Sequence, residues 1–301
     1  MTIFLKRRTR TLFSLAVVSG LILSTLVSTL AVSAGSASAS SRRPLCVGTT
    51  QSPGVLAGKY RSGVKIEGVC AVNGDPTVVH GELTLAPGSA LVAAFALNDL
   101  TGKGVSKLTV LGGITVGNGA TLILGCDASS FLCVDDPSQS APTLSSPAVL
   151  GGNLNEDQAL GVIMDDATIN GNLRQTGGGG GVNCDGPTTE VFSLFGSPVY
   201  STYEDSAVHG VVMISGVRSC WMGVIREDVS GSMTINNNKM ADPDAMEINS
   251  NQIAGDLTCM RNSMAWDELG RVQQPVPAGA GAEHGRRSQG RPVRAVQSRH
   301  R

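Results

Sequence analysis

The chain has 301 residues, of which 41% are hydrophobic and 16% are charged. This balance excludes an intrinsically disordered chain, and the formal net charge of −1 excludes the strongly basic composition of many nucleic-acid-binding proteins. Glycine is frequent, at 38 residues, whereas aromatic residues make up only 4%. Many glycines and few aromatic residues favour a fold with many tight turns over an ordinary helical globule.

The charges are distributed unevenly along the chain. Residues 1–39 carry four basic residues and no acidic one, and residues 271–301 carry seven arginines and one acidic residue. The part between them, residues 40–270, holds 12 basic and 23 acidic residues, a net charge of −11. Because nucleic-acid phosphates repel such an acidic body, we expect no nucleic-acid partner.

The first 39 residues have the organisation of a secretory signal peptide. The basic segment Lys6–Arg10 precedes an almost continuous apolar run, Leu12–Val32, and Ala37–Ala39 fits the small residues of a cleavage site. We therefore expect a secreted protein, free or associated with the cell wall, with no membrane attachment after cleavage. An uncleaved anchor is the alternative, because about 20 apolar residues can span a bilayer.

Seven cysteines follow this segment. In an exported chain cysteines are expected to form disulfides, and neighbours in sequence suggest the pairs Cys46–Cys70, Cys126–Cys133 and Cys184–Cys220. Cys259 is then left over. The sequence has no Cys-x-x-Cys motif and no cluster of cysteine and histidine at zinc-binding spacing, so we do not expect a zinc site.

A degenerate six-residue pattern recurs between residues 44 and 263. It consists of a branched apolar residue, any residue, glycine, any residue, an apolar residue and any residue, and it begins at Val79, Leu150, Ile169, Val208, Val229 and Ile253. The starts differ by 71, 19, 39, 21 and 24 residues, near multiples of about 20, as in a solenoid with insertions. Alternation of apolar and polar residues has the period of a β-strand, and only stacked turns would bury the inner faces. The pattern predicts a parallel β-helix over residues 44–263.

These turns resemble those of secreted right-handed parallel β-helix proteins of high-GC Gram-positive bacteria, and more loosely those of bactofilin-like repeats. The resemblance covers about residues 44–263 and implies an all-β, right-handed solenoid, but it specifies architecture and not activity. Near the end of this region we expect asparagines to stack in a hydrogen-bonded ladder, ordinary polar turns being the alternative. The asparagines are Asn236, Asn237, Asn238, Asn249, Asn251 and Asn262.

Two segments depart from the repeat. The run Gly177–Gly181 is expected to be a flexible start to an insertion over residues 177–207, tethered by Cys184. The aromatic residues of this insertion either cover the open side of a turn or stack on sugar rings. Residues 264–301 are expected to form an irregular basic tail, whose composition is typical of a frameshift product of GC-rich DNA. The alternative is a genuine tail that binds anionic wall polymer or a membrane surface.

Several acidic and basic residues are candidates for polysaccharide chemistry. A lyase resembling the pectate type would need carboxylates that hold Ca²⁺ and a basic residue nearby, whereas a glycosidase would need two spaced carboxylates. Simple solvated acids are the plainer interpretation, and a Ca²⁺ loop at Asp242–Asp244 with Glu247 is a further alternative. The candidate acids are Asp127, Asp135, Asp136, Asp165, Asp166, Glu227, Asp228, Asp242 and Asp244, and the candidate bases are Arg218, Arg226 and Lys239.

No catalytic motif emerges from these residues, and no cofactor is expected except Ca²⁺. The sequence therefore predicts a secreted or cell-wall-associated structural or binding protein, with cell-wall or extracellular polysaccharide as its partner. The alternative is an extracellular polysaccharide lyase or hydrolase that uses an acidic, calcium-binding groove. Self-association through exposed end turns is a third interpretation, because uncapped strand edges invite pairing.

Overall fold

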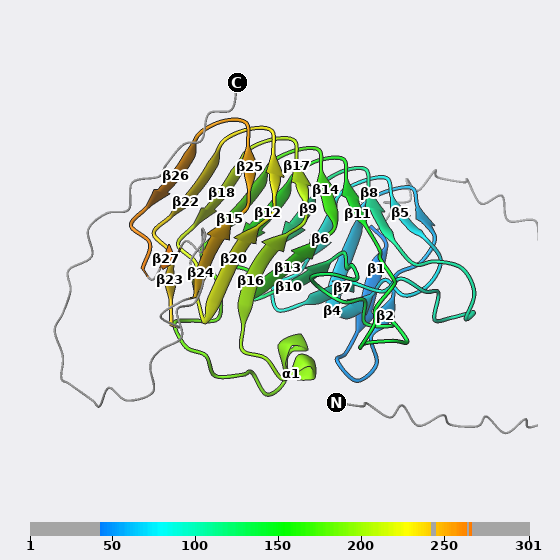
Figure 1. The fold of residues 1–301 in the computed structure, drawn as a ribbon. Helices are drawn as coiled ribbons and strands as arrows, with labels where there is room; N and C mark the ends of the chain where they lie inside the picture. The colour runs from blue at the N-terminus through cyan, green and yellow to red at the C-terminus, as the bar shows by residue number, and fades with distance from the viewer. Residues whose placement is uncertain (1–42, 242–244, 264, 267–301) are drawn as a thin grey trace, which may run out of the picture. The chain divides into compact units, whose positions relative to one another are not determined.

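The computed structural model describes residues 43–241, 245–263 and 265–266. The described chain forms a right-handed parallel β-helix, which confirms the predicted fold class (Figure 1). The expected signal peptide, residues 1–39, lies outside the described residues, as does most of the expected tail, residues 267–301.

The strands of the solenoid form three faces, which the chain visits in the order face 1, face 2, face 3. Strand β4 runs through the first corner and joins faces 1 and 2 into one sheet of 17 strands, whereas face 3 is a separate sheet of eight strands. Face 1 consists of β1 (Leu45–Gly48), the first half of β4 (Val64–Ala71), β6 (Leu83–Leu85), β9 (Ile114–Val116), β12 (Leu154–Asp157), β15 (Leu173–Thr176), β18 (Val212–Ser215), β22 (Met233–Asn236) and β26 (Leu257–Met260).

The other two faces complete each turn. Face 2 consists of β2 (Gly54–Val55), the second half of β4, β7 (Ala90–Ala93), β10 (Thr121–Leu124), β13 (Gly161–Asp165), β16 (Tyr200–Glu204), β20 (Trp221–Ile225), β24 (Met246–Asn249) and β27 (Ala265–Trp266). Face 3 consists of β3 (Lys59–Tyr60), β5 (Thr77–Val79), β8 (Leu108–Val110), β11 (Ala148–Leu150), β14 (Ala167–Ile169), β17 (Ala207–Val208), β21 (Asp228–Val229) and β25 (Gln252–Ile253). A further two-stranded pair, β19 (Arg218–Ser219) and β23 (Lys239–Met240), lies in the connections from face 1 to face 2.

Inward-pointing side chains of the three faces form the core. In face 1 one buried apolar residue follows another in strict register from turn to turn: Leu83, Ile114, Leu154, Leu173, Val212 and Met233. Each fully buried side chain of this size contributes about 1.5–3 kcal/mol relative to an exposed one. Because a single turn exposes its inner residues above and below, this stabilisation arises only when turns stack.

The corners before and after face 2 turn by means of the left-handed backbone. At least one residue in each of the later turns has a positive φ at each of these corners, as expected for sharp bends. After face 1 these residues are Gln158, Gly177, Gly216, Asn237 and Arg261, and after face 2 they are Gly125, Asp166, Asp205, Arg226 and Ser250.

The glycine of the six-residue pattern occupies the corner from face 3 to face 1. The pattern therefore spans two strands and the corner between them. A Cβ atom at Gly231 would lie 2.4 Å from the carbonyl oxygen of Gly210 in the preceding turn. The backbone N–H of Gly231 donates to that same oxygen at 2.9 Å. Glycine is required here because the backbones of successive turns approach so closely that a side chain would collide with the preceding turn.

The number of residues between two six-residue patterns is not proportional to the number of turns between them. The 71 residues from Val79 to Leu150 contain two turns with loops, through Val110 of β8. The 39 residues from Ile169 to Val208 form a single turn with one excursion, because β14 pairs directly with β17.

That excursion occupies residues 177–199 and contains the short helix α1 (Val191–Phe195). It is narrower than the predicted insertion, 177–207, because the following residues form β16 and β17. Its glycine run is also bonded into the stack: Gly179 N–H donates to the Ala159 carbonyl and Gly181 N–H to the Arg218 carbonyl, both at 2.9 Å. The start of the insertion, which we expected to be flexible, is thus a corner that is hydrogen-bonded to the neighbouring turns.

Three disulfides join Cys46 to Cys70, Cys126 to Cys133 and Cys184 to Cys220, the neighbouring pairs that the sequence suggested. Cys259 is free and exposed. The first disulfide links β1 to β4, the second closes a loop that follows β10, and the third ties the excursion to the residue before β20.

The asparagine ladder forms in part. Asn262 Oδ1 accepts hydrogen bonds from the backbone N–H of Asn238 at 3.0 Å and from its side-chain amide at 3.1 Å. Asn238 Oδ1 in turn accepts from the backbone N–H of Val217 at 2.9 Å. At the corner after face 2, Asn251 Oδ1 accepts from Glu227 N–H at 2.9 Å. These side chains bond successive turns along the axis, as expected.

Candidate functional site

The outer surface of face 2 is covered over its earlier turns. Ile123 and Ile163, which point outward from β10 and β13, are fully buried in a second apolar cluster. Phe192 of α1 belongs to this cluster, as does the disulfide Cys126–Cys133. From β16 onward the outward residues include Tyr200, Thr202, Glu204 and Trp221, so the character of the surface changes there.

A pocket with a volume of ≈ 360 Å³ lies at this boundary. Strands β16 and β20 supply its floor, the disulfide loop supplies Phe131, and the excursion supplies Pro198. The eight lining residues are Ser130, Phe131, Asp165, Pro198, Tyr200, Thr202, Glu204 and Trp221.

Two aromatic rings dominate the floor of the pocket. The ring centroids of Tyr200 and Trp221 lie 5.5 Å apart, with an edge-to-face angle of 69°. A Cβ atom on Gly223 would lie 2.5 Å from the Trp221 ring, so glycine at this position lets the indole lie close over the strand. Burial raises the pKa of Tyr200 to about 12, so its hydroxyl remains protonated at neutral pH. Both side chains are half-buried, and their rings present an apolar surface to the pocket.

Next to the pocket lies an acidic corner built by three segments. Asp127 belongs to the disulfide loop, Asp165 ends β13, and Asp205 is the left-handed residue after β16. One carboxylate oxygen from each lies within 4.8 Å of the others. Asp127 is fixed by the backbone N–H groups of Ser129 and Ser130, which donate to its Oδ1 at 2.6 and 2.7 Å.

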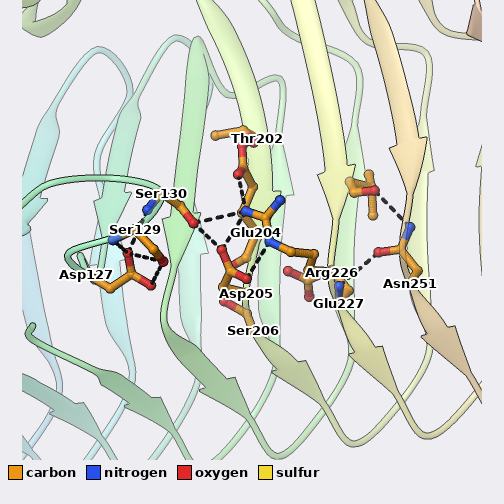
Figure 2. Close-up of polar contacts among 11 residues, drawn as sticks. Asp127, Ser129, Ser130, Thr202, Glu204, Asp205, Ser206, Arg226, Glu227 and Asn251 are labelled. Carbon is orange, nitrogen blue, oxygen red and sulfur yellow. Dashed lines mark hydrogen bonds and ion pairs between the residues drawn. The ribbon is translucent and has the colours of Figure 1, made fainter. Parts of the chain in front are cut away.

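Arg226 is the basic residue of this corner (Figure 2). Its Nε and Nη2 donate to the two oxygens of Asp205, each at 2.6 Å, and Nη2 lies 2.9 Å from Glu204 Oε2. Ser130 donates its hydroxyl proton to Asp205 as well. The bond from Arg226 lowers the pKa of Asp205, and the same contact raises the pKa of Arg226. Arg226 therefore keeps its proton and does not suit the role of a catalytic base.

Three carboxyl groups near this corner that Arg226 does not contact, those of Asp165, Asp166 and Glu227, carry raised pKa values. Burial first, and then the nearby carboxylates of Asp127 and Asp205, raise the pKa of Asp165 to about 8. Burial, and then the same two neighbours, also raise the pKa of Asp166. Burial raises the pKa of Glu227 to about 8. The corner thus concentrates more negative charge than its surroundings neutralise, and it favours a proton or a cation.

The structure brings together five of the candidate residues from the sequence: Asp127, Asp165, Asp166, Arg226 and Glu227. Asp135 and Asp136 instead hold loop backbone: Asp135 accepts from the N–H groups of Ala96 and Leu97. Backbone N–H groups of the loop likewise lower the pKa of Asp136.

The other candidates lie apart from the pocket. Arg218 and Lys239 are paired in register in the connections from face 1 to face 2. Asp228 is exposed at the start of β21. Asp242 and Asp244, and with them the proposed Ca²⁺ loop, lie outside the described residues.

Sequence reasoning missed Glu204 and Asp205, and it placed Tyr200 on the insertion. The feature that could have identified Glu204 and Asp205 is their place at the end of a face 2 strand, at the corner that follows it. Asp166, Asp205 and Arg226 each follow a face 2 strand at the same corner, which the register of the strands reveals but their separation in sequence hides.

Comparison of the chain with protein-family models, with curated proteins and with solved structures finds no match. Among the described residues, no helix has the length and apolarity needed to cross a membrane. The three disulfides are typical of an oxidising compartment. The protein is thus a disulfide-bonded right-handed β-helix with a half-open aromatic and acidic pocket on face 2.

Proposed function

We propose that this chain is a secreted or cell-wall-associated binding protein that holds carbohydrate chains in the face 2 pocket. The observation that carries the proposal is the pairing of Tyr200 and Trp221 with Thr202 and Glu204 in one half-open pocket. Aromatic rings match the apolar C–H face of a sugar, and hydroxyl and carboxylate groups bond its hydroxyls.

The export signal in the sequence and the disulfides in the structure support an extracellular setting. Polysaccharides of the cell wall or the extracellular matrix are the carbohydrate available there. Glu204 lines the pocket and the acidic corner adjoins it, so a polymer of neutral or amino sugars fits its charge better than a polyuronate does. The rigid stack of strands beneath the pocket holds Tyr200 and Trp221 in place before binding.

The first experiment uses the oxidised chain from Ser40 to Arg301. We would measure its binding to a panel of neutral, amino and acidic polysaccharides by calorimetry, for the wild type and for Trp221→Ala. Loss of a central aromatic contact is expected to weaken binding at least about tenfold. Met213→Ala is the matched control, since Met213 is an exposed apolar residue on the outer side of face 1.

Two results would contradict the proposal: no binding across the panel, or equal affinity of the wild type and Trp221→Ala. The same samples test the alternative of a polysaccharide lyase or hydrolase. Release of new reducing or unsaturated ends by the pure protein would make it an enzyme. The fixed proton on Arg226 argues against a lyase that uses this residue as its base.

A further inference from the structure

We propose that Asp127, Asp165 and Asp205 bind a divalent cation of the Ca²⁺ type at the corner after face 2. One carboxylate oxygen of each residue lies within 4.8 Å of the others. Oxygens that share one Ca²⁺ at bond lengths of 2.3–2.6 Å lie at most about 5 Å apart, so the three atoms fit around one ion. This inference goes beyond carbohydrate binding and does not depend on it.

Asp165 supplies the independent observation that points to a ligand. Its side chain is 1% exposed, and neither carboxylate oxygen has a hydrogen-bond partner. Buried polar groups in folded proteins are nearly always bonded, because desolvation without a partner is costly. Asp165 faces two other carboxylates, which supply no proton when ionised. A bound cation would satisfy its oxygens, and those of its neighbours, at once.

The other two carboxylates are held in place before any ion binds. Figure 2 shows Ser130 between them, its backbone N–H on Asp127 and its hydroxyl on Asp205. Arg226 fixes the plane of Asp205 with two bonds. Each carboxylate has about four acceptor positions, so these bonds leave lone pairs free for a metal ion. Because the carboxylate ligands from the loop and from two successive turns are already fixed, little conformational entropy is lost when the ion binds.

The chemistry of the donors selects the class of ion. The three ligands are all carboxylates, which suit hard cations such as Ca²⁺ and Mg²⁺ better than zinc or copper. The corner remains acidic even with Arg226, because Asp166, Glu204 and Glu227 surround the three ligands as well. Ca²⁺ accepts irregular sets of carboxylates and fills its shell with water, whereas Mg²⁺ requires near-ideal octahedral geometry.

The ion would link the loop Cys126–Cys133 to the ends of β13 and β16. That loop also carries Phe131, a wall of the pocket. Bound Ca²⁺ would therefore stabilise the folded state, since a ligand that binds only the folded chain raises its stability by mass action.

The test is a titration of the oxidised chain, residues 40–301, after treatment with EDTA and without sugar. We expect one calorimetric site for CaCl2, weaker binding of MgCl2, and a Tm that rises with Ca²⁺. In Asp165→Asn the Ca²⁺ affinity should fall at least about tenfold, and the rise in Tm should disappear. Asp228→Asn, an exposed acid on the following turn, is the matched control and should bind like the wild type.

Asp127→Asn is the second variant, because Asp127 lies in a loop and its loss should leave the stacked turns intact. Absence of both heat and a Tm shift in the wild type at millimolar Ca²⁺ would overturn the proposal. Unchanged Ca²⁺ affinity in both Asp165→Asn and Asp127→Asn would overturn it too, since the ion would then bind elsewhere. Trp221→Ala should lose affinity for sugar and keep its affinity for Ca²⁺. This variant therefore distinguishes a failure of the Ca²⁺ proposal from a failure of the carbohydrate proposal.

Discussion

At the scale of single residues, a polar chain runs through the core of the solenoid. The Tyr203 hydroxyl lies 2.5 Å from Glu156 Oε2 and 2.9 Å from Gln175 Oε1, and all three residues are buried. One hydroxyl proton cannot serve two acceptors. Burial raises the pKa of Glu156 to about 8, so at neutral pH its carboxyl is protonated. It then donates to Tyr203, whose own proton goes to Gln175.

This arrangement predicts a pH-dependent stability to which Glu156 contributes. The folded chain retains a proton that the unfolded chain, with a pKa near 4.5 at this residue, releases. The stability is therefore fully present below pH 4.5 and falls as pH rises toward 8, by about 3 kcal/mol up to pH 7. Glu156→Gln removes the titration, so its free energy of unfolding in urea should depend less on pH between 5 and 8.

The control for this change is Asp157→Asn, whose side chain is exposed on the outer side of the same strand. Its pH profile should follow that of the wild type. If the Glu156→Gln and wild-type profiles run parallel from pH 5 to pH 8, then Glu156 is not one of the buried acids that make stability depend on pH.

At the scale of the elements, the corner from face 3 to face 1 determines how closely successive turns stack. Glycines occupy the same place in seven turns and bring the backbones into direct contact: Gly81, Gly112, Gly152, Gly171, Gly210, Gly231 and Gly255. Any side chain in this column would push two neighbouring turns apart. The repeated glycine of the sequence is thus a packing requirement between turns, and not a property of one strand.

The column predicts that Gly231→Ala destabilises the protein. The new Cβ would meet the Gly210 carbonyl oxygen at 2.4 Å, and backbone cannot move aside as a flexible side chain can. We expect a loss of about 1–3 kcal/mol in the free energy of unfolding in urea. Gly186→Ala is the control, since its Cβ would meet nothing closer than 3.6 Å and should change stability by less than about 0.5 kcal/mol. Equal effects of the two substitutions would contradict the role of the column.

The strands and disulfides were readable from the sequence because each depends on local spacing. Apolar alternation marked the inner residues, and neighbouring cysteines formed pairs across one loop or one turn. The pocket and the acidic corner were not readable, because Asp127, Asp165 and Asp205 meet only through the register of stacked turns. Loops of unequal length between turns conceal that register, as the single turn from Ile169 to Val208 shows.

At the scale of the whole molecule, stability should vary along the solenoid axis. Each turn contacts chiefly the turns before and after it, so residues at the same place in different turns differ in how many neighbours bury them. Leu154 and Leu257 both begin a face 1 strand two residues after a column glycine. Leu154 pairs with Ile114 on one side and Leu173 on the other and is fully buried. Leu257 belongs to the last described strand of face 1 and is 38% exposed.

Truncation of these two leucines should therefore have unequal costs. Leu154→Ala opens a cavity between two packed turns, and we expect a loss of about 2–4 kcal/mol in the free energy of unfolding in urea. Leu257→Ala removes a side chain that water already reaches in part, so its loss should stay below about 1.5 kcal/mol. Sedimentation of the same samples tests the predicted self-association. If Leu257 were covered by a second copy, Leu257→Ala would cost as much as Leu154→Ala, and its cost would grow with protein concentration.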